Sequence, residues 1–405
     1  MSKPQVAIQR CAIGAAQAEV DAAVAEAVHA IGGIPPAVRT ARSIVVKPNY
    51  VGVMFRARNE DVRMHKGRHA HNTEPAVCAA AVKLIREANP SATIYYGDGL
   101  DIQHAHRTKE DIFDFMGATS LAKEYDLTLL DCNEGEFVQV PVPGGVMLRY
   151  LWVRREIAEA DTYVSLAKLK CHQTAGFTIS TKNMFGLLPR AHYGAGNRGF
   201  MHQNAHRLMR VFVTVNQAFP QSFQVIDGIV GTNHGMSGEP KEAGLVMAGT
   251  NSIATDAVGM KVMGFDPQAD FGTPPFFIAE NHLLLAERAG LGTTNLDEIE
   301  VVGESPESFG LQFETRPEAD FSHAKAAAIL DATRAQARVY LEKRDELLRS
   351  HRGKFVFLVD GEVVQSVATI AEAAKLDYFN NVHGFGFATQ VLPPAEAAEI
   401  VEAYL

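Results

Sequence analysis

Short apolar runs and amphipathic helical patterns alternate along most of the chain. Runs rich in β-branched and other apolar residues predict strands at Ser43–Val46, Thr93–Tyr96, Leu127–Asp131, Thr162–Leu166, Phe223–Asp227 and Leu245–Ala248. Apolar residues three and four positions apart predict helices at Val20–Ile31, Thr73–Ala88, Ala205–Phe219, Ser252–Met263 and Phe276–Ala289, with Thr73 as an N-cap. This alternation is typical of an α/β fold, in which a mostly parallel sheet carries helices on both faces.

The pattern changes near Gly303, so we expect residues 1–304 to form the α/β core domain. Residues 305–350 are predicted to be a helical linker, with one long charged helix over Ala324–Arg349. Residues 351–405 are predicted to be a small α+β appendage, because Asp360-Gly361 separates two β-rich runs and is typical of a hairpin turn. A final helix is expected from Pro394, and the appendage is expected to be structural or to support a homo-oligomer.

Polar motifs follow several of the predicted strands directly. They are Lys47-Pro48-Asn49, Gly97-Asp98-Gly99, Lys168–His172 and Asp227-Gly228. In open parallel sheets, ligands bind beyond the carboxyl ends of the strands. The motifs therefore predict one composite site at that edge of the sheet.

The richest of these stretches, Asp161–His192, gathers cations and an imidazole beside small polar residues, a pattern that suits anion binding. Together with the other motifs, this stretch predicts that Lys47, Asn49, Lys168, Lys170, Asn183 and Gly176 bind the substrate. The predicted catalytic residues are His172, His106, Lys182 and Asp98. Lys168 and Lys170 are expected to face opposite sides of the sheet, so that only one of them enters the site.

Histidines also suggest a metal site, because imidazole and carboxylate are the usual ligands of Fe, Zn and Ni. The predicted ligands of a divalent transition metal are His69, His71, His172, His192, His202 and Asp227. The segment around His69-x-His71 is equally well explained as a solvated basic loop or as a lid over an anion.

Composition narrows the classes of partner. A net charge of −9 and the lack of a long basic run argue against nucleic acid. No apolar run approaches the ~20 residues that span a bilayer, and the start lacks a signal pattern, so we expect a cytoplasmic protein without membrane contact. The four cysteines lack a CxxC pair, which excludes an iron–sulfur cluster motif. No P-loop or strand-linked GxGxxG motif for NAD is found, and Gly194–Gly199 is interpreted as a flexible active-site loop.

Six motifs resemble, in order, the family catalogued as domain of unknown function 362. The matching segments are Val45–Asn49, Thr73–Pro75, Tyr96–Gly99, Lys168–Pro189, Val225–Ile229 and Ala248–Pro267. The resemblance covers about residues 43–303 and implies no reaction. Many members carry a fused ferredoxin-like cysteine module, which this sequence lacks.

A second, local resemblance concerns chemistry. His172–Phe177 with Lys182 is similar to a motif of nickel-pincer lactate racemases, and His106–Asp111 is similar to a second racemase segment. The resemblance implies an acid/base role for the two histidines and a covalent cofactor on the lysine. The chain departs from the racemase pattern at Thr178–Thr181, where the racemase has Ser-Gly-Gly-Arg.

Two hypotheses follow. The first is an enzyme that acts on a small carboxylate or phosphate by metal-dependent acid/base or redox chemistry at the Lys168–Pro189 motif. The alternative is a non-catalytic sensor or carrier that binds a metal or an anion with the same residues.

Overall fold

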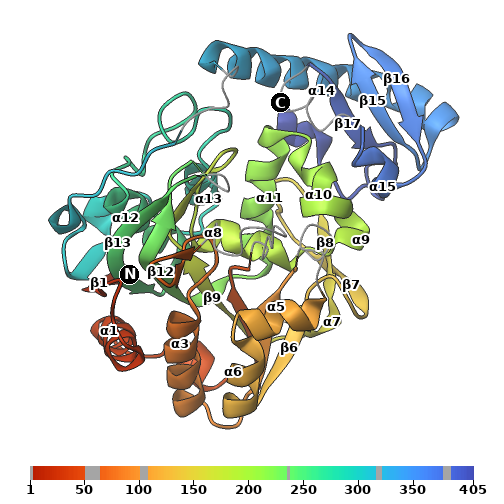
Figure 1. Ribbon diagram of the computed structural model, residues 1–405. Coiled ribbons are helices and arrows are strands. Elements are labelled where there is room, and N and C mark those ends of the chain that lie inside the picture. The colour runs from red at the N-terminus through yellow and green to blue at the C-terminus, as the bar shows by residue number, and fades with distance from the viewer. Residues whose placement is uncertain (1–2, 51–63, 101–107, 235–237, 316–321, 377–384) are drawn as a thin grey trace.

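A computed structural model describes residues 3–50, 64–100, 108–234, 238–315, 322–376 and 385–405, and its central feature is an eight-stranded sheet (Figure 1). The strand order is β14-β1-β13-β12-β9-β2-β5-β6. These strands are β1 (Gln5–Arg10), β2 (Ser43–Pro48), β5 (Thr93–Asp98), β6 (Leu127–Asp131), β9 (Thr162–Lys168), β12 (Gln221–Thr232), β13 (Pro240–Gly249) and β14 (Glu300–Gly303). Only β13 runs antiparallel to its neighbours β1 and β12, so the predicted α/β fold with a mostly parallel sheet is confirmed.

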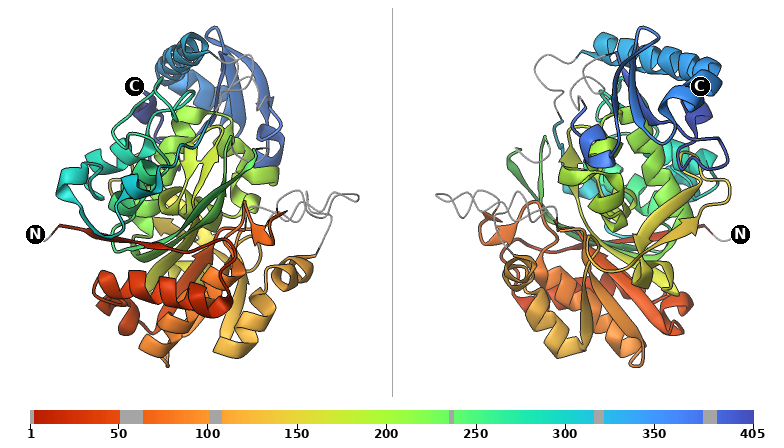
Figure 2. Two further views of the ribbon diagram at one scale, coloured as in Figure 1. Left: turned by 60° about the vertical axis from the view of Figure 1, so that its left-hand side comes forward. Right: turned by 90° about the vertical axis from the view of Figure 1, so that its right-hand side faces the viewer.

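Both faces of the sheet are covered by helices because alternate strand residues point to opposite sides. Ile44 and Val46 belong to one buried cluster, whereas Val45 between them belongs to another. The first cluster is covered by α1 (Gln17–Ala30), α2 (Pro36–Arg39), α3 (Pro75–Ala88), α5 (Lys109–Phe115) and α6 (Ala118–Tyr125) (Figure 2). On the other face lie α8 (Ser180–Asn183), α11 (Ala205–Ala218), α12 (Ser252–Val262) and α13 (His282–Arg288).

Shorter elements connect these layers. They are β3 (Met64–His65), β4 (Arg68–His69), β7 (Phe137–Pro141), β8 (Tyr150–Arg154), α7 (Arg155–Ala158), β10 (Lys170–His172), β11 (Gly176–Thr178), η1 (Met184–Leu187), α9 (Arg190–Tyr193), α10 (Ala195–His202), η3 (Leu296–Glu298) and η4 (Pro306–Phe309). None of the helices in the described part of the chain is long and apolar enough to cross a membrane.

The C-terminal part contains the long helix α14 (His323–His351) and a sheet of β15 (Phe355–Val359), β16 (Glu362–Val367) and β17 (Phe387–Gln390). The predicted hairpin at Asp360-Gly361 is confirmed, because β15 and β16 pair in antiparallel order across it. The short helix α15 (Ile370–Ala373) follows. The helix expected from Pro394 is wrong: the chain there forms only the 3-10 turn η5 (Val401–Tyr404).

Two predicted helix starts are also wrong. α13 begins at His282 instead of Phe276, because Asn281 caps it and also binds the carbonyls of Pro267 and Ala269. α3 begins at Pro75 after Glu74, so Thr73 is not its cap.

The C-terminal sheet packs on the α/β unit through α11. The fully buried Arg207 of α11 pairs with Glu399, and its guanidinium donates to the carbonyl of Phe200. Tyr340 of α14 and Phe355 of β15 lie in the same buried cluster as α11. One continuous core therefore joins the two parts, and the boundary at residue 304 stays a prediction.

Candidate active site

The carboxyl ends of β2, β5 and β9 and the middle of β12 bring four predicted site residues together. Lys47 is in β2, Asp98 ends β5, Lys168 ends β9, and Asp227 of β12 pairs directly with Lys168 in the strand register. All four side chains are buried. The sequence motifs at the strand ends therefore meet in space, as the parallel topology requires.

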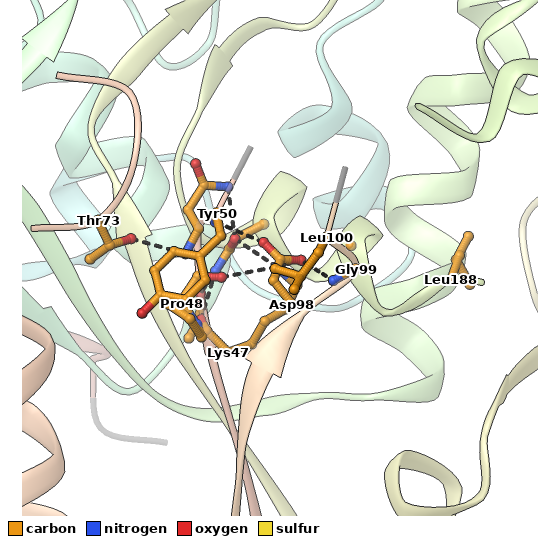
Figure 3. Close-up of polar contacts among 12 residues, drawn as sticks. Lys47, Pro48, Tyr50, Thr73, Asp98, Gly99, Leu100 and Leu188 are labelled. Atoms are coloured by element: carbon orange, nitrogen blue, oxygen red, sulfur yellow. Dashed lines mark hydrogen bonds and ion pairs between the residues drawn. The ribbon is translucent and has the colours of Figure 1, made fainter. Parts of the chain in front are cut away.

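Lys47 and Asp98 form a buried ion pair, with 2.8 Å between Nζ and Oδ1 (Figure 3). The Asp98 carboxylate also accepts hydrogen bonds from the backbone N–H groups of Tyr50 at 2.8 Å and Gly99 at 2.7 Å. Gly186 packs so closely that a Cβ there would lie 2.2 Å from Asp98 Oδ1. The carboxylate predicted to be catalytic is thus committed to a lysine and two amides.

A second buried pair joins Lys168 to Asp227, with 2.7 Å between Nζ and Oδ2. Lys168 Nζ also donates to the carbonyl of His69 at 2.6 Å, and Asp227 accepts from the N–H of Glu74 at 2.7 Å. Because an unpaired charge away from water is costly, this pairing accounts for both residues without a ligand.

Lys170 lies close to the same segment, contrary to the prediction that it faces away from Lys168. Its Nζ donates to Asn49 Oδ1 at 2.8 Å and to the carbonyl of His71 at 2.6 Å. The prediction is wrong because residues two positions apart in an extended chain point to the same side. Both lysines therefore bind the backbone of residues 69–71.

Asn183 connects these pairs into one network. Its Oδ1 accepts from Lys47 Nζ and Asn49 Nδ2, each at 3.0 Å, and its Nδ2 donates to the carbonyl of Lys47 and to Ser165 Oγ. Thr73 adds a further link, because its hydroxyl accepts from the N–H of Asn49 and donates to the carbonyl of Leu166. The Thr73 hydroxyl, predicted to cap α3, therefore links Asn49 to Leu166 of β9 instead.

Lys182 differs from the other three lysines, because no hydrogen bond or ion pair joins its amine to a described residue. The short helix α8 positions it: Asp256 accepts hydrogen bonds from the N–H groups of Ser180 at 2.9 Å and Thr181 at 2.7 Å. The amine lies 5.7 Å from the centre of the Phe212 ring. Burial, and then the positive charges of Lys47 and Arg198, lowers the pKa of Lys182 to about 7.

His172 is held in a single neutral tautomer. Its Nδ1 accepts hydrogen bonds from the N–H groups of Thr174 and Ala175, both at 3.1 Å, so Nδ1 carries no proton and Nε2 does. Burial, and then the charge of Lys182, holds the pKa of His172 well below its ordinary value. The side chain is half-buried and offers Nε2–H as a donor. Metal-binding histidines usually donate their second N–H to an acceptor, and here two donors occupy Nδ1, which argues against His172 as a ligand.

Sequence reasoning missed His282, a fully buried histidine near Lys182. Its ring stacks on Phe177 with centroids 4.7 Å apart and meets Phe212 edge-on at 5.5 Å. Neither ring nitrogen has a hydrogen-bond partner among the described residues. Burial, and then the charge of Lys182, lowers the pKa of His282 to about 3. In the sequence, His282 is a histidine within a segment predicted to be helical, and this pattern does not distinguish a buried histidine from one on the surface.

The His282 ring makes stability sensitive to acid. Its pKa is about 3 in the folded protein against 6.5 for the free side chain, so the unfolded chain binds the proton more readily between those values. Folding stability is therefore lost as the pH falls below 6.5. We expect His282→Phe to remove about 2 kcal/mol of this loss at pH 5, because phenylalanine keeps the stacking without the titrating nitrogens. Urea unfolding of both proteins from neutral pH to pH 5 measures this, and identical pH profiles would contradict it.

The residues predicted to bind a metal do not form one site, although His172 and His202 lie close enough to interact electrostatically. No group of three or more His, Cys, Asp or Glu side chains suited to a metal occurs among the described residues. His69 is buried edge-on against Phe115, and burial lowers its pKa to about 4. His202 lies edge-on to Phe185, and His192 stacks on Trp152 on another part of the molecule. Asp227 is paired with Lys168 as described above.

The structure gives two further predicted site features, Gly176 and Gly194–Gly199, roles that differ from those predicted. Gly176 pairs with His172 in the β10–β11 hairpin at φ +79°, where a Cβ would lie 3.0 Å from Pro275, so the structure explains this glycine by packing. Gly194–Gly199 is wrongly predicted as a loop, because helix α10 begins at Ala195. Arg198 of that helix donates to the carbonyls of Leu188 and Gly186, which places its charge near the site. His106 lies outside the described residues.

The fold and the site define an α/β protein with a buried, cation-rich polar network at the carboxyl ends of its parallel strands. The chain belongs to the family described as a domain of unknown function, DUF362, whose model matches residues 44–261. It is also similar to a thylakoid-associated protein of Synechocystis sp., with 26% identity over 271 residues, which covers 65% of this chain and 73% of that protein. The local similarity to nickel-pincer racemases stays a prediction.

Proposed function

We propose that the protein is an enzyme that acts on a small carboxylate or phosphate at Lys182 and His172. The observation that carries the proposal is the Lys182 amine, which has a pKa of about 7 and no hydrogen-bond or ion-pair partner among the described residues. A lysine amine poised near neutral pH can act as a base, and its protonated form attracts an anion.

His172 supplies the second group. Its Nε2–H is a neutral donor that can stabilise negative charge developing on a substrate oxygen while Lys182 exchanges a proton with the neighbouring carbon. These two groups favour acid/base chemistry. The proposal includes no step through a metal, since the His, Cys, Asp and Glu side chains of the described residues form no group of three or more that could hold one.

Lys47, Lys168 and Lys170 have a different role in this proposal from the one predicted from sequence. Their amines already bind Asp98, Asp227, Asn49 and backbone carbonyls. They hold the strand ends in position, and Lys182 is the cation left to meet a substrate.

The experiment is a thermal-shift screen of acetate, lactate, pyruvate and inorganic phosphate, followed by NMR of each stabilising compound in D₂O. We expect a carboxylate to raise the melting temperature and its carbon-bound hydrogen to exchange with solvent. Lys182→Met and His172→Ala should each slow this exchange by about 10²-fold or more. Lys123→Met, at an exposed position, is the matched control and should leave the exchange unchanged.

The alternative, a sensor or carrier that binds an anion without turnover, uses the same two donors. It predicts a thermal shift that is lost in Lys182→Met and no exchange in the native protein. Neither a shift nor exchange with any of these compounds would contradict both functions.

A further inference from the structure

A cavity of about 290 Å³ lies where the C-terminal sheet meets the α/β unit, apart from Lys182 and His172. Its walls come from β8, from α9 and α10, and from the segment that follows β17. The residues that line it include Tyr150, Trp152, His192, Phe200, Phe355 and Glu399. Residues distant in sequence thus line one partly open cavity, which the proposed function does not use.

The cavity wall is aromatic and already ordered. Trp152 stacks on His192 with centroids 4.5 Å apart and an interplanar angle of 8°. Phe137 packs edge-on against the His192 ring with centroids 5.4 Å apart, and Phe200 packs edge-on against Phe355 at 5.2 Å. Aromatic surfaces fixed in this way favour a planar ring, which can stack or pack edge-on against them.

The volume sets the size of the ligand. An engineered apolar cavity of ~150 Å³ takes up benzene, so a cavity of about twice that volume accommodates one ring with a substituent, or two fused rings.

Glu399 sets the polarity of the ligand. Its carboxylate accepts from Arg207 and from Tyr404 through Oε1, and from Thr389 Oγ1 at 2.7 Å through Oε2. A carboxylate offers about four acceptor positions, so one position on Oε2 is unused by the described residues. A ligand that presents a hydrogen-bond donor can use this position, whereas a carboxylate ligand has no donor to offer it.

We propose that this cavity is a binding site for a small aromatic compound that carries a hydrogen-bond donor, such as a phenol. The proposal is independent of the function proposed for Lys182.

The chain has one tryptophan, Trp152, so its fluorescence reports directly on this cavity. We expect phenol to change the emission of Trp152 with a saturable dependence on concentration. Benzoate should bind about tenfold more weakly or worse, because it has no donor for Glu399 Oε2. Ala398→Leu fills the cavity and should weaken phenol binding by about tenfold or more. Ala397→Leu serves the same purpose if the first variant is unstable.

Ala395→Leu is the matched control, because Ala395 is exposed in the same segment and does not line the cavity. It should bind phenol as the native protein does. Fluorescence changes that rise linearly without saturation, or equal phenol binding by Ala398→Leu and Ala397→Leu, would overturn the site. Equal binding of benzoate and phenol would overturn the requirement for a donor.

Discussion

Lys168→Met is expected to lower the free energy of unfolding by about 3–5 kcal/mol, the largest change that we predict for stability. Lys168 and Asp227 are both fully buried and 2.7 Å apart, so the variant leaves an uncompensated carboxylate in the interior. The variant also loses the hydrogen bond from Lys168 Nζ to the carbonyl of His69. Urea unfolding of the native and variant proteins measures the change.

The matched control for this experiment is Lys109→Met. Lys109 forms an exposed pair with Glu134 at 2.6 Å, and exposed pairs contribute little because water screens both charges. We expect the control to change stability by about 0.5 kcal/mol or less. The double variant Lys168→Met with Asp227→Asn should recover part of the loss, since no charge is left buried without its partner. A loss in Lys168→Met as small as in Lys109→Met would show that the pair does not stabilise the fold.

Lys182 is expected to titrate near pH 7, the largest effect that we predict for chemical reactivity. About half of its amine is then neutral at pH 7, against ~0.04% for an amine with the ordinary lysine pKa near 10.4. The cause is burial together with the nearby charges of Lys47 and Arg198. Since only the neutral amine attacks an acylating reagent, trace labelling with acetic anhydride from pH 5 to pH 9 should show reactivity that rises to a plateau above pH 7.

Mass spectrometry of the labelled peptides measures this profile for each lysine in one sample. The exposed Lys123 is the internal reference for the reagent. Lys182→Met should fold as stably as the native protein at pH 7 or more stably, because burial disfavours the ammonium that methionine replaces. A labelling profile for Lys182 that is still rising at pH 9, with no plateau, would contradict the proposed role as a base.

The α/β fold and the edge of the sheet that carries the site could be predicted from the sequence. Apolar runs of strand length, separated by helical periodicity, allow few topologies, and a parallel sheet places its polar strand ends together. Lys47, Asp98, Lys168 and Asp227 were therefore predicted at one place and are found there.

The roles of those residues needed the tertiary structure, because a lysine is free or neutralised according to partners that are distant in sequence. Lys168 meets an aspartate 59 residues away, and Lys170 meets Asn49 across 121 residues. Lys168 and Lys170 point to the same side, as residues two positions apart in an extended chain do, but only the structure shows that they meet the carbonyls of His69 and His71. The predicted metal site fails for the same reason, because the spacing of histidines in the sequence does not show which imidazole rings lie close together in the fold.

By itself, the sequence determined the class of fold, the family and the strand-end motifs, because local periodicity and motif order are properties of the chain. Only the tertiary structure decided that the Lys182 amine has no hydrogen-bond or ion-pair partner among the described residues, that His172 is a fixed donor and that His282 lies near Lys182. It also decided that an aromatic cavity forms where the C-terminal sheet meets the core. Each of these depends on side chains from separate elements meeting in a shared core, where burial and neighbouring charge set their chemistry.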